Sequence, residues 1–535
     1  MPPDHEGGTA HDSRRPLGRA LALIMAVTVS LAGCAVGPNY RTPKTSLPPD
    51  YAAKGVIPSS TGQPAQVELA SWWRSLADPE LDSLIERAVR ANPDVLIALD
   101  RLQAARTYEV GTFSALLPDA EASGGAGRGT GNDVGRGRAS QQLVSAVPGL
   151  GARQVNVLAG FDAVWEIDIF GKYRRAYEAS RADTRAAAAA RNTVLVSVIA
   201  DVARAYIDLR GLQNRSAVLH AAIRVLEQSL NIVTERFNRG ITNELDVTLA
   251  TRELETLKAQ VAPLDAQVEA AEYTIATLLG AFPEDLVREL TPPGMLPALP
   301  AQVAAGAPVD LLRRRPDIQQ VEAQLAAATA RIGVAEGSLF PEVAMTGALG
   351  YAQQTGGGLP VAKQHIWAAG PAAAWPLLDF GALDAQVQIA NLETRALLTS
   401  YKQTIQRAVQ EVDTALSAYQ AEQVSLASLE AALVASRRAV TLAQERYDRG
   451  LTDFLNVIDA ERQEYALEDQ YAQTQVTTCE QLIAFYRSLG GGWQQYQSLP
   501  PVRRPLPAVI AMFRSVLARE DPLSDPGAAA TAPTP

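Results

Sequence analysis

The chain has 535 residues, 20% of them charged and 47% hydrophobic, which is typical of a folded protein and excludes wholesale disorder. Its formal net charge of −10 argues against nucleic acid as a partner. Cys34 and Cys479 are its two cysteines, and its four histidines are dispersed, so we expect no disulfide framework, no metal site and no cofactor.

The first 33 residues have the features of a lipoprotein signal peptide. Three arginines precede an apolar run at residues 20–32 that is too short to span a bilayer comfortably. The run ends in LAGC, which resembles the bacterial lipobox, so Cys34 is the expected lipidation site. Acyl chains would add roughly 0.8 kcal/mol of membrane affinity per buried methylene. Position 35 is Ala rather than Asp, which by analogy with known lipoproteins favours the outer membrane over retention at the inner membrane. A plain secretory signal is the alternative interpretation.

Residues 34–70 are rich in proline and polar side chains and are expected to form an extended tether. Helical periodicity follows from residue 79 to residue 117. It is interrupted at Asn92-Pro93-Asp94, which predicts two helices that meet at a corner.

Residues 118–168 and 341–378 change to a period of two, which predicts two β-hairpins. Their strands are about ten residues long with aromatic residues at the ends, the weak signature of transmembrane β-strands. A soluble hairpin fits the strand pattern equally well. No hydrophobic stretch of about 20 residues follows the signal peptide, so we do not expect a membrane-spanning helix.

Residues 195–237 carry apolar side chains every three or four positions, with Ser216 as the polar exception, which predicts a coiled-coil seam within one long helix at residues 172–238. Such a helix would span ~100 Å at about 1.5 Å per residue. A returning helix is predicted at residues 242–280, with a kink or local unwinding at Pro263. The second half has the same pattern, with helices at residues 382–449 and 452–489.

The turns between the paired helices are copies of one motif. ERFNRGITNELDV and ERYDRGLTDFLNV occur 210 residues apart. Gly240 and Gly450 can end a helix at little cost, because glycine enters the left-handed region without a side-chain penalty. Thr242 and Thr452 are placed to accept hydrogen bonds from the first N–H groups of the next helix.

The chain therefore reads as two copies of one unit, residues 71–290 and 309–493. Residues 291–308 link them, and residues 494–535 form a tail that is disordered at its end. The expected fold is mainly helical, with long coiled-coil hairpins and a transmembrane β-barrel. Four strands cannot close a membrane barrel, so the barrel requires an oligomer, and a conducting barrel requires about three copies.

Several motifs are specific enough to indicate a family. They are CAVGPNY after the lipobox, SWWRSLADPELDSLIERAVRANPDV, the Trp and Phe-Gly exits of both hairpins, LNVIDAER beside the second turn, and LGGGW near the end. In these motifs the chain resembles the outer membrane factors of tripartite efflux systems. This is the TolC-like family, in its lipoprotein branch with OprM and NodT. The resemblance covers roughly residues 34–493.

The resemblance implies a homotrimer with a twelve-stranded β-barrel and a twelve-helix periplasmic α-barrel, lipid-anchored in the outer membrane of a Gram-negative bacterium. It implies a passive exit duct for multidrug or solute efflux that is gated at the periplasmic helix tips. A periplasmic adaptor protein and an inner membrane pump of the proton-driven RND type are the implied partners. The sequence does not specify the transported substrate.

The resemblance also points to a gate. Tyr447, Leu455 and Asp459 match residues that constrict the aperture in relatives. Leu455 and Asp459 are four residues apart and share a helix face, so three copies would form an apolar ring beside an acidic ring that favours cations. The alternative is that Leu455 belongs to the seam and Asp459 pairs with Arg462.

Charged residues near the tips either form ties between helices or remain solvated; these are Arg239, Asp448, Arg449 and Asp453. Thr452 stands where one relative has arginine, so an identical latch is not expected. The family places the adaptor contact on the turns themselves, which carry Arg239, Gly240, Thr242, Arg449, Gly450 and Thr452.

Two other functions fit the same elements: a type I protein-secretion outlet, and a structural envelope lipoprotein that uses its coiled coil as a spacer. Catalysis has little support. His220 lies within the seam helix and Cys479 is interpreted as a small packing residue, so we assign no catalytic residue and do not expect an enzyme.

Overall fold

The computed structural model describes residues 35–53, 69–126, 155–297, 308–356 and 359–497. The chain divides into two units, residues 1–495 and 496–535, and only residues 496 and 497 of the second are described. Cys34, the predicted lipidation site, lies outside the described residues. The same holds for part of the predicted linker and for most of the predicted tail.

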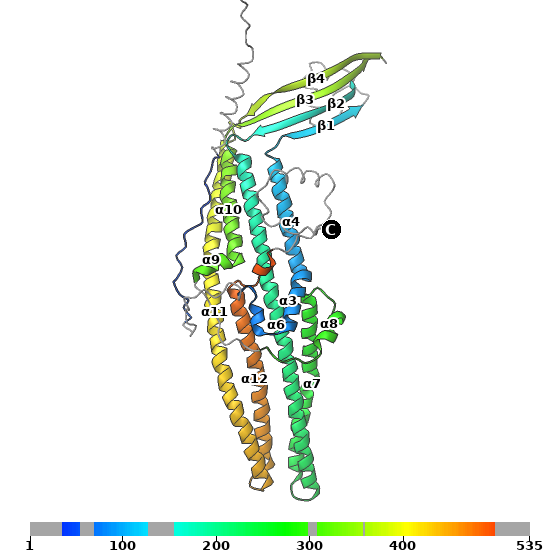
Figure 1. Ribbon diagram of the computed structural model, residues 1–535, viewed down its shortest axis with the longest axis vertical. Coiled ribbons are helices and arrows are strands. Elements are labelled where there is room, and N and C mark those ends of the chain that lie inside the picture. The colour runs from blue at the N-terminus through cyan, green and yellow to red at the C-terminus, as the bar shows by residue number, and fades with distance from the viewer. Residues whose placement is uncertain (1–34, 54–68, 127–154, 298–307, 357–358, 498–535) are drawn as a thin grey trace, which may run out of the picture. The chain divides into compact units, whose positions relative to one another are not determined.

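The first unit is mainly helical with one β-sheet, which confirms the predicted fold class (Figure 1). The elements of the first half are η1 (Trp72–Leu76), α3 (Pro79–Ala91), α4 (Pro93–Ser114), β1 (Asp119–Ala126), β2 (Val155–Ile167), α6 (Lys172–Asn238), α7 (Glu244–Leu278) and α8 (Pro283–Leu290). Those of the second half are η3 (Pro308–Asp310), α9 (Leu311–Arg314), α10 (Pro316–Gly337), β3 (Glu342–Gly356), β4 (Leu359–Ala374), α11 (Phe380–Asp448), α12 (Phe454–Ser488) and η4 (Gln494–Tyr496).

The sheet unites the two halves of the chain. Its strands pair antiparallel in the order β1-β2-β3-β4, so β2 and β3 form the junction. Phe161, Leu349 and Trp367 lie side by side in this register and are 67%, 60% and 74% exposed. On the opposite face Asp162 and Ala348 are buried. Because strand side chains alternate between faces, one face of the sheet is an exposed apolar surface.

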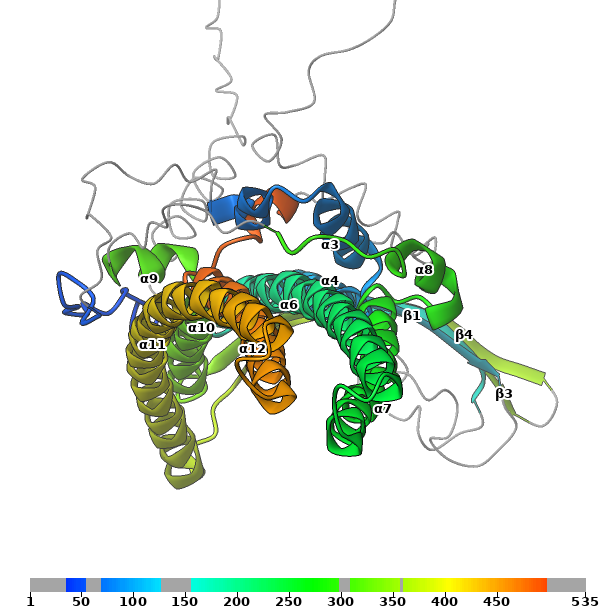
Figure 2. The ribbon, with the colours of Figure 1, turned by 90° about the horizontal axis from the view of Figure 1, so that it is seen from below.

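Helix α6 is the central element of the helical part. It packs against α3, α4, α7, α10 and α12. In the view of Figure 2, α11, α12, α6 and α7 follow one another along a curved row. An 18-residue window of α6 has a mean hydropathy of 1.4, enough for a membrane helix, but 56% of that window is buried in the fold. No membrane-length apolar stretch was expected after the signal peptide, and the apolar character of this window is explained by the helices that pack against α6.

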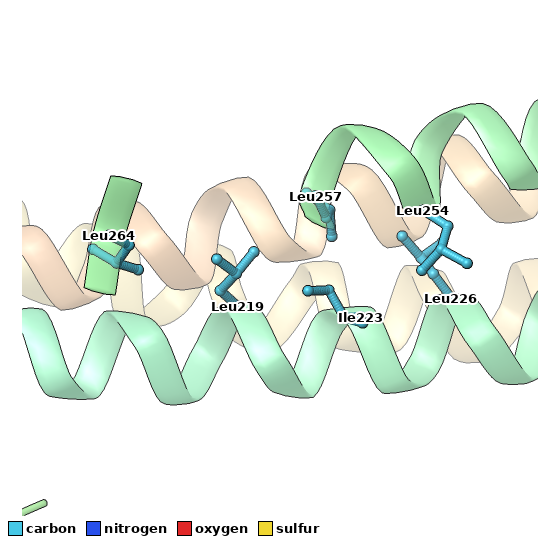
Figure 3. Close-up of a cluster of buried hydrophobic side chains, with 6 residues drawn as sticks. All are labelled: Leu219, Ile223, Leu226, Leu254, Leu257 and Leu264. Atoms are coloured by element: carbon cyan, nitrogen blue, oxygen red, sulfur yellow. The ribbon is translucent and has the colours of Figure 1, made fainter. Parts of the chain in front are cut away.

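The predicted seam joins α6 to α7. Figure 3 shows Leu219, Ile223 and Leu226 of α6 facing side chains of α7. Their α7 neighbours in this buried cluster are Leu254, Leu257 and Leu264. The spacing of three and four residues therefore predicted both the helix, which has the expected bounds, and its buried face.

The predicted unwinding at Pro263 is wrong, since α7 is one continuous helix from Glu244 to Leu278. Pro263 lies on the exposed side of α7, and so does Ala259, whose carbonyl loses its helical donor. Water can satisfy that carbonyl, so the helix tolerates the proline at this position.

Residues 35–53 have no helix or strand, but they are fastened to both halves of the chain. The Arg175 guanidinium donates hydrogen bonds to the carbonyls of Val36 and Gly37 at 3.0 Å, and to Asn39 Oδ1 at 2.8 Å. Gly37 has a φ of +91°, and a Cβ there would lie 2.4 Å from the Cα of Gly333 in α10. The expected tether is therefore a docked strap.

Replacement of Arg175 by alanine is expected to release this strap. Arg175 is 4% exposed, and hydrogen bonds to a charged group are each worth about 1.5–3 kcal/mol, so tryptic cleavage after Arg41 or Lys44 should accelerate at least tenfold. Mass spectrometry of timed digests measures the rate. Arg181→Ala is the matched control, because the Arg181 side chain is exposed on the same helix and lies 3.9 Å from Glu109. Equal cleavage rates in both variants would contradict the anchoring of the strap by Arg175.

Candidate functional site at the helix tips

The two turns lie at the end of the long helices opposite to the sheet (Figure 1). Gly240 and Gly450 have φ values of +72° and +69°. In each turn the glycine N–H bonds the carbonyl three residues back and the next N–H bonds the carbonyl five residues back, at 2.8–2.9 Å. This is the Schellman arrangement, and it confirms both glycines as helix ends.

The predicted threonine caps are wrong. Asn243 caps α7, with its side chain accepting from the N–H of Asp246 at 3.2 Å, and α12 has no side-chain cap. Thr242 donates to the carboxylate of Asp246, whereas Thr452 accepts from Asn456 Nδ2 at 2.7 Å. After the left-handed glycine, the chain reaches the extended conformation of an N-cap residue only at Asn243 and Asp453. Each N-cap position therefore lies one residue after the predicted threonine.

Tyr447 is buried between the two helical hairpins. It is 5% exposed and packs in one cluster with Val233 of α6 and Ala250 of α7. The Arg236 guanidinium lies 4.5 Å from the centre of its ring. Burial raises the pKa of Tyr447, against the opposing effect of Arg236, so the phenol is neutral at physiological pH.

Leu455 and Asp459 lie together on the exposed side of α12. Leu455 is 55% exposed, which contradicts the alternative that it belongs to the seam. Asp459 does accept a hydrogen bond from Arg462 at 2.7 Å, but both side chains are more than half exposed, so this pair is weak. Tyr447 does not share their exposed face.

The inter-hairpin tie at the tips comes from a residue that the sequence analysis missed. Arg236 Nη1 lies 4.0 Å from Asp448 Oδ1 across the two hairpins. Arg239 instead pairs with Glu235 of its own helix at 3.4 Å. Within the described part of the chain, Arg449 makes no ion pair within 4.0 Å. Arg236 and Arg446 occupy the same position in the two copies of the turn motif. This repetition marks Arg236 in the sequence but does not reveal its partner.

Comparison with known proteins identifies this architecture. Residues 84–281 and 307–491 match the family model described as "Outer membrane efflux protein". The chain belongs to the outer membrane efflux protein family. It is of the OprM/NodT type, as the sequence motifs indicated.

Relatives within the outer membrane efflux protein family are similar over most of their length. Nodulation protein T of Rhizobium leguminosarum bv. trifolii is 29% identical over 439 residues, 81% of this chain and 89% of that protein. The outer-membrane channel OprN is 37% identical with a TM-score of 0.74, over 86% of this chain and all of that one. The open state of the Neisseria gonorrhoeae MtrE outer membrane channel is 27% identical with a TM-score of 0.72, and the match covers 86% of this chain and 99% of that one.

This outer membrane efflux protein is therefore located in the outer membrane and extends into the periplasm. Its family and fold are those of channels, and it has the role of an efflux duct. The helix tips, at the far end of α6 and α11 from the exposed apolar face of the sheet, are then the periplasmic end.

Proposed function

We propose that three copies of this chain form a continuous exit duct across the outer membrane, passive and without catalytic residues. The observation that carries the proposal is the four-stranded sheet with an exposed apolar face and two edges, β1 and β4, that pair with no further strand among the described residues. Open edges are not tolerated in a bilayer, because no water satisfies their N–H and C=O groups. Pairing of β1 with β4 of the next copy would close a twelve-stranded barrel.

The same threefold arrangement would gather twelve long helix segments into a periplasmic tube. We propose the division into two repeats, residues 71–290 and 309–493, and the two matched segments of the family model support it. The exposed turns at Gly240 and Gly450 would contact a periplasmic adaptor, and an inner membrane pump, of the proton-driven RND type implied by the resemblance, would supply the energy. Lipidation at Cys34 remains part of this proposal.

At the periplasmic end, three copies of Leu455 and Asp459 would line the closed aperture. Their exposure on one face of α12 supports this assignment. Tyr447 would act differently from the sequence prediction, by holding the hairpins together from inside their interface. The resulting gate is an apolar constriction next to three carboxylates, which repel one another and attract cations.

Conductance in planar lipid bilayers tests the duct. The purified protein should form channels, with a trimer mass in detergent by native mass spectrometry. A pure trimer that conducts no ions would overturn the proposal. Failure to form a trimer would remove the basis for barrel closure.

Asp459→Asn tests the gate. Removal of the acidic ring is expected to lower the preference for cations in the closed state, measured as a shift of the reversal potential toward zero in a salt gradient. Glu445→Gln is the control, because it removes an exposed carboxylate of α11 near the same tip. An unchanged reversal potential in Asp459→Asn would remove Asp459 from the gate.

A further inference from the structure

The interface between the two helical hairpins contains polar contacts above the tips. Arg215 of α6 bonds Asp469 of α12 at 2.7 Å, and Tyr465 of α12 bonds Gln260 of α7 at 3.0 Å. Nearer to the tips, the Ser229 hydroxyl of α6 donates to Glu461 Oε1 of α12 at 2.9 Å. The Ser229–Glu461 contact differs from the Arg215–Asp469 ion pair because the carboxyl group of Glu461 faces a hydroxyl group and not a cation.

The second carboxylate oxygen of Glu461 has no partner. Oε2 is inaccessible to solvent and makes no hydrogen bond to any described residue. An ionised carboxylate buried in this way loses hydration that nothing replaces. A protonated carboxyl removes the charge and leaves the Ser229 contact intact.

Charged groups on the three helices packed against α12 are engaged with other partners. On α11, Arg437 pairs with Glu464 at 3.6 Å and with Glu468 at 2.6 Å. On α7, Glu253 lies 3.9 Å from Arg252, and on α6 Arg215 is engaged by Asp469. Arg236, nearer to the tip of α6, contacts Asp448.

Burial raises the pKa of Glu461 to about 7; the Ser229 hydrogen bond acts against this shift, and Glu464 adds to it. The group therefore titrates near neutral pH while α12 is packed on α6. In water, a glutamate released from this interface would titrate near 4.5.

We propose that Glu461 is a proton-operated latch between the two helical hairpins. Protonated Glu461 lets α12 stay packed on α6, and ionised Glu461 favours separation of the two helices at the periplasmic end. The contact itself is independent of transport, whereas its consequence for conductance rests on the proposed duct.

The sign follows from the two protonation equilibria. Below pH 4.5 the carboxyl is protonated in both states, so the packed state keeps its full advantage. Between 4.5 and about 7 the separated state loses its proton first, so each pH unit reduces the packed-to-separated ratio by up to tenfold. Above that range the ratio stays low and constant.

Distances between spin labels measure this equilibrium directly. Asn231→Cys in α6 and Gln463→Cys in α12 place labels at exposed positions near Ser229 and Glu461. The native Cys479 is 1% exposed and burial raises its pKa to about 12, so it should not react. The full-length chain is labelled and assembled with excess unlabelled chain, so that distances within one chain dominate.

The short-distance population is expected to fall as pH rises from 5 to 8. Glu461→Gln, which imitates the protonated form, should keep the short distance at every pH. Ser229→Ala removes a hydrogen bond to Glu461 that only the packed state makes, so it should lower the short-distance population, most clearly at pH 8, where the carboxyl is ionised.

Glu255→Gln is the control, because it removes an exposed carboxylate of α7 and should titrate like the parent. A distance that does not change with pH in the parent would overturn the latch. Equal pH dependence in Glu461→Gln, or an unchanged short-distance population at pH 8 in Ser229→Ala, would overturn it as well. The spin-label distances are measured without any conductance. A failure of the proposed latch can therefore be distinguished from a failure of the proposed duct.

Discussion

Arg236→Ala is expected to raise the closed-state conductance by roughly tenfold. The guanidinium stacks on the buried Tyr447 ring at 4.5 Å and reaches Asp448 at 4.0 Å, so it joins the tips of the two hairpins. A desolvated cation–π contact is worth about 1–2 kcal/mol, and a half-exposed ion pair at most about 1 kcal/mol. Loss of roughly 1.4 kcal/mol in each protomer shifts the closed-to-open equilibrium of that protomer's tip tenfold.

Single-channel recording in planar bilayers measures this effect. Arg239→Ala is the matched control, since Arg239 lies three residues further along and, among the described residues, forms its ion pair with Glu235 of its own helix. It should leave the closed-state conductance unchanged. If both variants behave like the parent, Arg236 does not hold the tips together; if both rise equally, the effect comes from tip charge rather than from the tie.

Arg210→Ala is expected to destabilise the fold by about 2–3 kcal/mol. The Arg210 side chain is 3% exposed and bonds Glu80 at 2.5 Å. It also donates to Gln213 Oε1 at 2.7 Å and to the carbonyl of Pro292 at 2.8 Å. Removing one partner of a fully buried pair costs about 3–5 kcal/mol, and Glu80 is partly solvated, which lowers the figure.

Thermal unfolding followed by helical circular dichroism should show a lower midpoint for Arg210→Ala. Arg210→Lys keeps the charge but loses the forked geometry of the guanidinium, so its unfolding midpoint should lie between those of the parent and Arg210→Ala. Arg204→Ala is the control on the same helix, because Arg204 is half exposed and lies 3.4 Å from Glu480. A midpoint equal to that of Arg204→Ala would contradict the structural role of Arg210.

Local periodicity was sufficient to predict the long elements. The seam predicted one long helix, whose expected bounds at residues 172–238 match those of α6, and the two Arg-Gly turns predicted where the helices reverse. These features depend on residues within one or two helical turns, so they can be recognised without the fold. The spacing of Leu455 and Asp459 likewise predicted a shared face, which the structure confirms as exposed.

Contacts between the hairpins were beyond the sequence. Tyr447 was predicted to line the aperture, yet its ring is buried beneath Arg236 because α6 and α12 lie side by side. The Ser229–Glu461 contact joins residues 232 positions apart. Glu461 lies within the motif LNVIDAER, but the motif does not reveal that Ser229 is its partner. The titration of Glu461 depends on what surrounds its carboxylate, which only packing decides.

The sequence by itself thus determined the helices, the strands, the duplicated turns and the family to which the motifs belong. Only the tertiary structure decided which segment covers each helix face, which charges cross between hairpins, and that the strap at residues 35–53 is docked. The reason is range: helix seams and turns arise from neighbours along the chain, whereas burial and ion pairing arise from segments that meet after folding.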